Sequence, residues 1–135
     1  MVNTPLIAWL YPETDDSGRF YGDRTNYNHF ISAGNYSPGS WTLYHTGSTT
    51  DFGSIPVNEW VMVTMSYANG NLKVYINNNL EVDIETSKST SNGSSGIFST
   101  RSFGKAFVGY IDEIKIWDEQ LSDSDVTRYH SATSP

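Results

Sequence analysis

Apolar and polar residues alternate in several short stretches of this sequence, and this period of two is the feature that most restricts the fold. Residues 80–85 place Leu, Val and Ile on one side and three acidic residues on the other. Residues 61–67 place Val, Val, Met and Tyr on one side and Met, Thr and Ser on the other. Because successive side chains of a strand point to opposite faces of a sheet, each stretch predicts a strand with at least one buried face.

Residues that favour tight turns separate the alternating stretches. Asn69 and Gly70 predict a type I′ hairpin, because both central residues of that turn need a positive φ. Three asparagines at 77–79 predict a second turn, and the polar residues 47–56 predict a loop. Many short strands joined by turns predict an all-β fold, an antiparallel two-sheet β-sandwich.

The two ends of the chain predict a covered strand and a short helix. Residues 4–11 are apolar on both sides, as in a strand that is covered on both faces. Near the other end, the strand pattern of residues 107–117 is followed by one short C-terminal helical turn, expected from Ser122 to about Tyr129. Ser122 can cap the free N–H groups at the helix start, and Asp125 suits the positive end of the helix.

Length, charge and cysteine content exclude several classes of protein. The chain has 135 residues and no cysteine, which predicts a single domain over residues 1–135 without disulfides or thiolate chemistry. Its net charge of -7 disfavours a nucleic-acid partner, because phosphate groups would be repelled. No apolar run is long enough to cross a membrane, and the first residues lack the layout of a signal peptide. We therefore expect no nucleic-acid partner and no membrane insertion.

The sequence contains no recognisable group of catalytic residues. Glu81, Asp83 and Glu85 have the spacing of an exposed strand face, and the histidines are scattered along the chain. The sequence also lacks the Gly-x-Ser-x-Gly and His-Glu-x-x-His motifs and a glycine loop that could bind phosphate. We therefore expect that the protein is not an enzyme.

Aromatic and polar residues beside one predicted turn form the candidate ligand site. The apolar faces of sugars pack on aromatic rings, while polar side chains supply hydrogen bonds. For Trp41, a place in the core is the alternative, because large aromatic residues are mostly buried. The expected ligand-binding residues are Asn35, Tyr36, Trp41, Tyr44 and His45.

Carboxylates in two parts of the chain are candidate ligands for Ca²⁺. Asp112 lies in an otherwise apolar strand, where a buried charge needs a partner or a metal ion. Asp15 and Asp16, in a long polar loop, are the second candidate. The alternatives are a solvated loop for this pair, and for Asp112 hydrogen bonds from backbone N–H groups or an ion pair with Arg101 or Lys115.

Three segments resemble the motifs of one known family. Gly109 to Trp117, followed by Leu121-Ser122, resembles a closing signature; residues 59–77 resemble a hairpin that begins with Trp; and residues 5–12 resemble an early Ala-Trp strand. All three motifs are those of laminin G-like domains in the concanavalin A-like lectin/glucanase superfamily. The resemblance implies a jelly roll, in which two curved sheets pack face to face.

This resemblance implies a non-catalytic carbohydrate-binding or adhesion module whose partner is a glycan or glycoprotein. Such modules are usually attached to secreted enzymes, adhesins or surface proteins, so we expect an extracellular, surface-associated or virion location. Related jelly rolls often hold a structural Ca²⁺ near the closing strand, which contains Asp112 here. Two alternatives remain: a structural or assembly domain of a virion fibre, virion tail or bacterial surface protein, and a fragment of a jelly-roll polysaccharide hydrolase or lyase.

The start of the chain departs from the pattern of this family. The family normally has one or two strands ahead of the Ala-Trp strand, whereas only Met1 to Asn3 precede residues 4–11 here. Either the fold lacks these strands, or a homo-oligomer contact or a neighbouring domain completes the N-terminal sheet edge, or the sequence is truncated at this end. The second alternative follows from the tendency of unpaired strand edges to associate.

Overall fold

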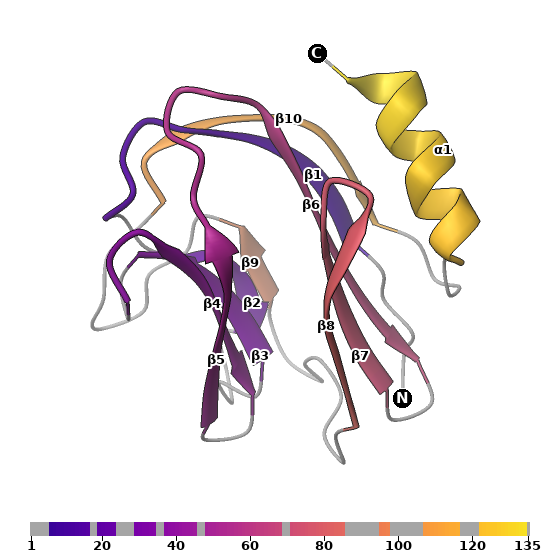
Figure 1. Cartoon of the computed structure of the whole chain (residues 1–135), viewed down its shortest axis with the longest axis horizontal. Coiled ribbons are helices and arrows are strands. Elements are labelled where there is room, and N and C mark those ends of the chain that lie inside the picture. The colour runs from indigo at the N-terminus through magenta and orange to yellow at the C-terminus, as the bar shows by residue number, and fades with distance from the viewer. Residues whose placement is uncertain are drawn as a thin grey trace.

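The computed structural model describes residues 6–16, 19–23, 29–34, 37–45, 48–68, 71–85, 95–97, 107–116 and 122–134. These residues form two antiparallel sheets of five strands that pack face to face, as expected for a jelly-roll sandwich (Figure 1). The first sheet contains, in order across it, β10 (Gly109–Ile116), β1 (Leu6–Pro12), β6 (Val61–Ala68), β7 (Asn71–Ile76) and β8 (Asn79–Glu85). The second sheet contains, in order, β5 (Ser48–Ser54), β4 (Ser40–His45), β3 (His29–Ala33), β2 (Arg19–Asp23) and β9 (Ser95–Ile97).

The main core lies between the two sheets and is built from alternating residues, as the sequence predicts. On β1, Leu6, Ala8 and Leu10 belong to this core, and all three are fully buried. The facing sheet contributes residues such as Ile31 and Leu43. The removal of this apolar surface from water is the principal stabilising contribution to the sandwich.

A second apolar layer lies on the outer face of the first sheet. Ile7 and Trp9 of β1 are buried there in one cluster with Val126 of the helix α1 (Asp123–Thr133). The helix packs on the side of the first sheet that faces away from the second sheet (Figure 1). Strand β1 is therefore covered on both faces, as its sequence predicts.

The helix begins as predicted but extends about one turn beyond its expected end. The N–H of Asp125 donates to Ser122 Oγ at 3.1 Å, and the N–H of Ser122 donates to Asp125 Oδ2 at 3.0 Å, which completes a capping box. The helix continues beyond Tyr129 to Thr133 because its last turn is held by the sheet, where Trp9 Nε1 donates to Thr133 Oγ1 at 2.8 Å. Within the described part of the chain, no helix is long and apolar enough to cross a membrane.

Residues 48–54 form the strand β5, so the prediction of a loop in this segment was wrong. The strand lies at one edge of the second sheet, and most of its side chains are exposed, with Phe52 as the buried exception. It is attached to β4 by the backbone ladder and by a hydrogen bond from Thr42 Oγ1 to Asp51 Oδ1 of 2.8 Å. Phe52 is the one large apolar residue of this segment, so β5 lacks the alternation that identifies the other strands.

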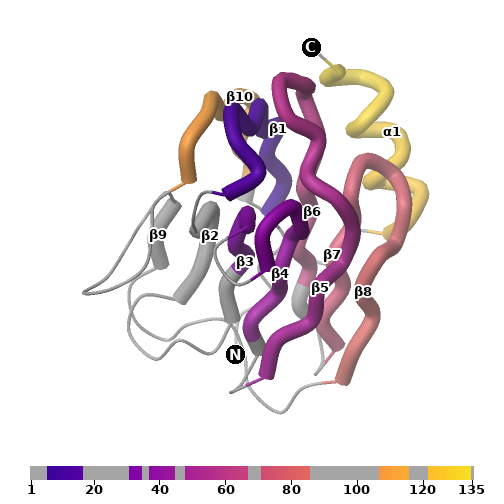
Figure 2. The backbone as a smooth tube through the Cα atoms, turned by 60° about the vertical axis from the view of Figure 1, so that its left-hand side comes forward, coloured from indigo at the N-terminus to yellow at the C-terminus, as the bar shows by residue number. Residues whose placement is uncertain are grey.

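Strand β10 lies at one edge of the first sheet, beside β1 (Figure 1 and Figure 2). The register of the pair shifts between Ile7 and Trp9, and Glu113 has a φ of 52°. Asp112 Oδ1 accepts a hydrogen bond from the N–H of Glu113 at 2.9 Å and thereby supports this irregular turn of the strand. Bulges of this kind discourage further pairing at an edge. The completion of a sheet edge by a second copy or a neighbouring domain stays a prediction.

Candidate ligand surface

Three aromatic side chains form a row across three neighbouring segments of the first sheet. Tyr110 of β10 lies opposite Tyr11 of β1, and Trp60 immediately precedes β6 on the other side of Tyr11. The ring centroids of Tyr11 and Tyr110 are 5.7 Å apart, and those of Tyr11 and Trp60 are 5.4 Å apart. We call Tyr11, Trp60 and Tyr110 the aromatic row.

The aromatic row lies on the outer face of the first sheet, beside the part that α1 covers. Tyr11 follows Ile7 and Trp9 on this face of β1, and the last turn of the helix contacts Trp9 through Thr133 and through a ring contact with His130, with centroids 5.1 Å apart. The row therefore continues the covered aromatic surface beyond the helix. Tyr110 is 58% exposed, and the other two rings are half-buried.

The backbone around the aromatic row leaves little space for adjustment. A Cβ atom on Gly109, which has a φ of 154°, would lie 2.1 Å from the carbonyl oxygen of Tyr11, so the two strands need glycine at this position. The N–H of Glu13 donates to the carbonyl of Val108 at 3.1 Å, and the N–H of Asn58 donates to the carbonyl of Pro12 at 2.7 Å. The three segments that carry the row are thus joined by the backbone itself, which holds the rings in place before any ligand binds.

Acidic residues lie close to the aromatic row in the sequence. Glu13, Glu59 and Asp112 each lie within two residues of a member of the row, and all three are exposed. No basic residue lies at the same sequence distance from the row. Asp112 lies opposite Trp9 in the register of β10 and β1, so the surface combines apolar rings with a carboxylate, which accepts hydrogen bonds.

The ligand site expected from the sequence receives one correction. Trp41 is fully buried in the core between the sheets, so its ring is not available to a ligand, and the alternative of a core residue is the one observed. Tyr44 is half-buried on the same strand. Asn35 and Tyr36 lie outside the described residues, as does the side chain of His45, so the remainder of this site stays a prediction.

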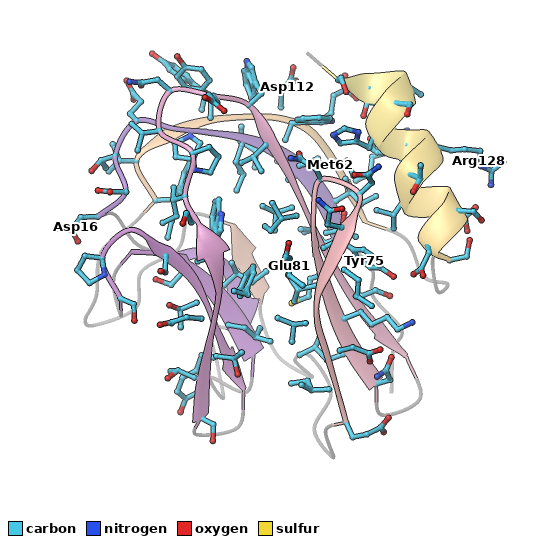
Figure 3. The ribbon with its side chains drawn as sticks, in the orientation of Figure 1. Asp16, Met62, Tyr75, Glu81, Asp112 and Arg128 are labelled. Atoms are coloured by element: carbon cyan, nitrogen blue, oxygen red, sulfur yellow. The ribbon has the colours of Figure 1, made fainter. Side chains whose placement is uncertain are left out.

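The carboxylates of the two separate Ca²⁺ candidates are exposed in the described structure. Asp112 is exposed, and not buried as its apolar strand suggests, because β10 is an edge strand. Asp15 and Asp16 are exposed at a different place, as Figure 3 shows for Asp16 and Asp112. Asp15 contributes its backbone, since its carbonyl accepts a hydrogen bond from Gly39 N at 3.0 Å.

The donor set expected for calcium is six or more oxygen ligands. Among the residues that the structure describes, no three side chains of Asp, Glu or His are grouped as a metal site requires. The described side chains therefore supply no such group, and the binding of Ca²⁺ stays a prediction.

Comparisons with known proteins agree with the fold. The family model Laminin_G_3, described as "Concanavalin A-like lectin/glucanases superfamily", matches residues 4–127 of the chain. A search of curated proteins found no match.

Solved structures of similar fold include carbohydrate-related domains. Domain 4 of a GH43 extracellular arabinanase from Geobacillus stearothermophilus, in complex with arabinotriose, has a TM-score of 0.72 and 27% identity, over 93% of this chain and 65% of that chain. A candidate carbohydrate-binding protein from Bacteroides ovatus has a TM-score of 0.75 and 13% identity, over 94% of this chain and 40% of that chain. The heptameric SAP-like pentraxin from Limulus polyphemus has a TM-score of 0.69 and 17% identity, over 93% of this chain and 68% of that chain.

The coverage and identity of these matches limit which properties of the similar proteins can be applied to this chain. The chain spans 65% of the length of the arabinanase domain and 40% of the Bacteroides protein. At 13% and 17% identity, the second and third likenesses show the fold alone.

Proposed function

The chain belongs to the Laminin_G_3 family of the concanavalin A-like lectin/glucanases superfamily, and from this premise we propose that it is a non-catalytic module that binds carbohydrate through the aromatic row. The observation that carries the proposal is the contact of Tyr11 with both Trp60 and Tyr110 on the outer face of the first sheet, with Tyr110 58% exposed. Aromatic rings pack against the C–H faces of sugars, and neighbouring carboxylates accept hydrogen bonds from hydroxyl groups.

The solved structures support a glycan as the class of ligand. The arabinanase domain was determined with arabinotriose, and it is 27% identical to this chain. A glycan or a glycoprotein is therefore the proposed partner, and adhesion at an extracellular or cell-surface location is the corresponding setting. The proposal assigns binding to the aromatic row and leaves Asn35, Tyr36, Tyr44 and His45 as a separate hypothesis.

The acidic side chains near the row support binding rather than catalysis. Hydrolysis of a glycosidic bond uses two carboxyl groups on opposite sides of that bond. The carboxyl group that acts as the acid is usually placed in an apolar pocket, where it keeps its proton near neutral pH. Glu13, Glu59 and Asp112 are instead exposed.

A second candidate function is that of a structural or assembly domain. Three of the large hydrophobic side chains that are exposed in the described structure lie on or beside the edge strand β10: Val108 at 48%, Tyr110 at 58% and Ile114 at 41%. Exposed apolar residues along a strand edge favour contact with another protein. The same surface could therefore serve a partner subunit instead of a sugar.

Glycan-array binding followed by titration calorimetry distinguishes the two candidates. We expect Tyr110→Ala to weaken glycan binding by about tenfold or more, as expected when an aromatic contact of this kind is lost. Leu80→Ala is the matched control, because Leu80 is 43% exposed on β8, at the opposite edge of the same sheet. If the two variants bind glycan equally well, the aromatic row is not part of the binding site. A wild-type protein that binds no glycan and elutes as an oligomer, with Tyr110→Ala restoring the monomer, would favour assembly.

A further inference from the structure

We infer that the aromatic row takes a soluble, neutral oligosaccharide and discriminates against anionic glycans and crystalline polysaccharide. The inference rests on the proposed carbohydrate function and specifies the ligand of the same surface. It follows from two independent properties of the row, the inclination of its rings and the sign of the charges around it.

The rings of the aromatic row do not share a plane. The ring of Tyr11 is inclined by 61° to that of Trp60 and by 59° to that of Tyr110. A flat crystalline surface can contact several rings at once only if the rings are coplanar. A soluble chain, in contrast, can turn between successive sugars and present a different face to each ring. The row therefore suits a flexible or twisted chain rather than a flat array.

The row also offers more than one place for a sugar. Tyr11 lies between the other two rings, and both centroid distances, 5.4 Å and 5.7 Å, are contact distances. Adjacent sugars of one chain can consequently pack on adjacent rings. Because the second contact is intramolecular once the first has formed, affinity should increase from a monosaccharide to a short oligosaccharide.

The charges around the row oppose an anionic ligand. Glu13, Glu59 and Asp112 are exposed and acidic, and the chain as a whole has a net charge of -7. The basic residue of β10, Lys115, lies opposite Ile7 on β1, beyond Trp9 and away from Tyr11. A uronic or sialic acid on the row would bring its carboxylate near Asp112, which lies opposite Trp9 on the same face, and the two like charges would repel. The hydroxyl groups of a neutral sugar instead donate hydrogen bonds to the carboxylate, and the negative charge of the carboxylate strengthens these bonds.

Matched pairs of probes that differ only in charge test the inference. The probes are oligogalacturonates against their methyl esters and sialyllactose against its methyl ester, together with neutral arabinose, xylose and glucose oligosaccharides of increasing length. Titration calorimetry is performed at low and high salt, and microcrystalline cellulose is used in a pull-down. We expect neutral probes to bind about tenfold or more tightly than their anionic counterparts at low salt, with a smaller ratio at high salt because salt screens exposed charges.

A charge variant links the result to the three acids. The variant combines Glu13→Gln, Glu59→Gln and Asp112→Asn, and it should reduce the neutral-to-anionic ratio, because the neutral probe loses charge-strengthened hydrogen bonds while the anionic probe no longer meets like charges. The inference is overturned if anionic probes bind as tightly as neutral ones, or if cellulose retains the protein in the pull-down. It is also overturned if the neutral-to-anionic ratio of affinities is the same in the variant as in the wild type. If no glycan of either charge binds, the proposed function itself fails, which is a distinguishable outcome.

Discussion

The hydroxyl group of Tyr75 on β7 donates a hydrogen bond to the carboxylate of Asp123 in the first turn of α1. Tyr75 is only 1% exposed, so this bond joins the buried outer face of the first sheet to the beginning of the helix. The bond between Trp9 and Thr133 holds the other end of α1. Together they determine where the helix lies, and therefore which part of the outer face, the aromatic row, is left uncovered.

The replacement Tyr75→Phe should destabilise the fold through the docking of α1. The variant removes one hydrogen bond to a carboxylate and keeps the buried ring, so we expect the free energy of unfolding to fall by about 1–2 kcal/mol. Urea denaturation measures the change. Tyr110→Phe is the control, because its hydroxyl is on a side chain that is 58% exposed and the variant should be as stable as the wild type. Equal stability of Tyr75→Phe and Tyr110→Phe would contradict the role of the bond.

Alkaline pH should lower the stability of the folded state through Tyr75. Burial, and then the hydrogen bond and charge of Asp123, raise the pKa of the Tyr75 hydroxyl above its ordinary value of 10.0. The folded state therefore holds this proton more tightly than the unfolded state, so the stabilisation is complete below pH 10 and is lost as the pH rises towards the folded-state pKa. We expect the urea midpoint to fall above pH 10.

The variant Tyr75→Phe assigns this alkaline loss to one hydroxyl group. Its urea midpoint should fall less steeply above pH 10 than that of the wild type. Part of the slope should persist, because burial also raises the pKa of Tyr129. Slopes that are identical in the two proteins would show that Tyr75 does not contribute.

Much of the fold follows from the sequence, and the exceptions have physical causes. Strands β1 and β6 are buried along most of their length, so burial imposes the apolar pattern by which they are predicted, and in β8 the alternation places the buried Val82 between exposed acids. The edge strand β5 has few buried residues and thus lacks the pattern. The C-terminal helix exceeds its predicted length because Trp9, more than one hundred residues away in the sequence, holds its last turn at Thr133. Local sequence does not contain that contact.

The candidate site was less predictable than the fold. Tyr11, Trp60 and Tyr110 are far apart in the sequence, and only the register of β10 and β1 and the start of β6 bring them together. Trp41 shows the opposite difficulty. Alternation places it on one face with Leu43, but alternation does not say which face of the sheet is buried. The pairing of Tyr11 with Tyr110 is the signal that would have located the site. This pairing can be recognised only when the order of the strands in the sheet is known.

Gly109→Ala should disturb the aromatic row and the stability of the sheet. The added Cβ would lie 2.1 Å from the carbonyl oxygen of Tyr11, so β10 must move away from β1. We expect a loss of roughly 1–3 kcal/mol in urea denaturation, as for other strained backbone positions, together with weaker glycan binding. Gly53→Ala is the control, because Gly53 has a φ of 101° but nothing lies within 4 Å of its added Cβ. A Gly109 variant that is no less stable than the Gly53 variant would rule out the steric explanation.

The calcium hypothesis has a direct test at Asp112. An ion that binds only the folded state stabilises it, by about 2.7 kcal/mol when its concentration is a hundredfold above the dissociation constant. If Asp112 is a ligand, Ca²⁺ should raise the thermal midpoint relative to chelator, and Asp112→Asn should abolish the rise. The amide keeps an oxygen that can accept the hydrogen bond from the N–H of Glu113, so the bulge of β10 is preserved while the charge is removed. Glu81→Gln, an exposed acid on β8, is the control and should keep the response. A thermal midpoint that changes with neither Ca²⁺ nor chelator would contradict the hypothesis. The remaining role of Asp112 would then be to support the turn at Glu113.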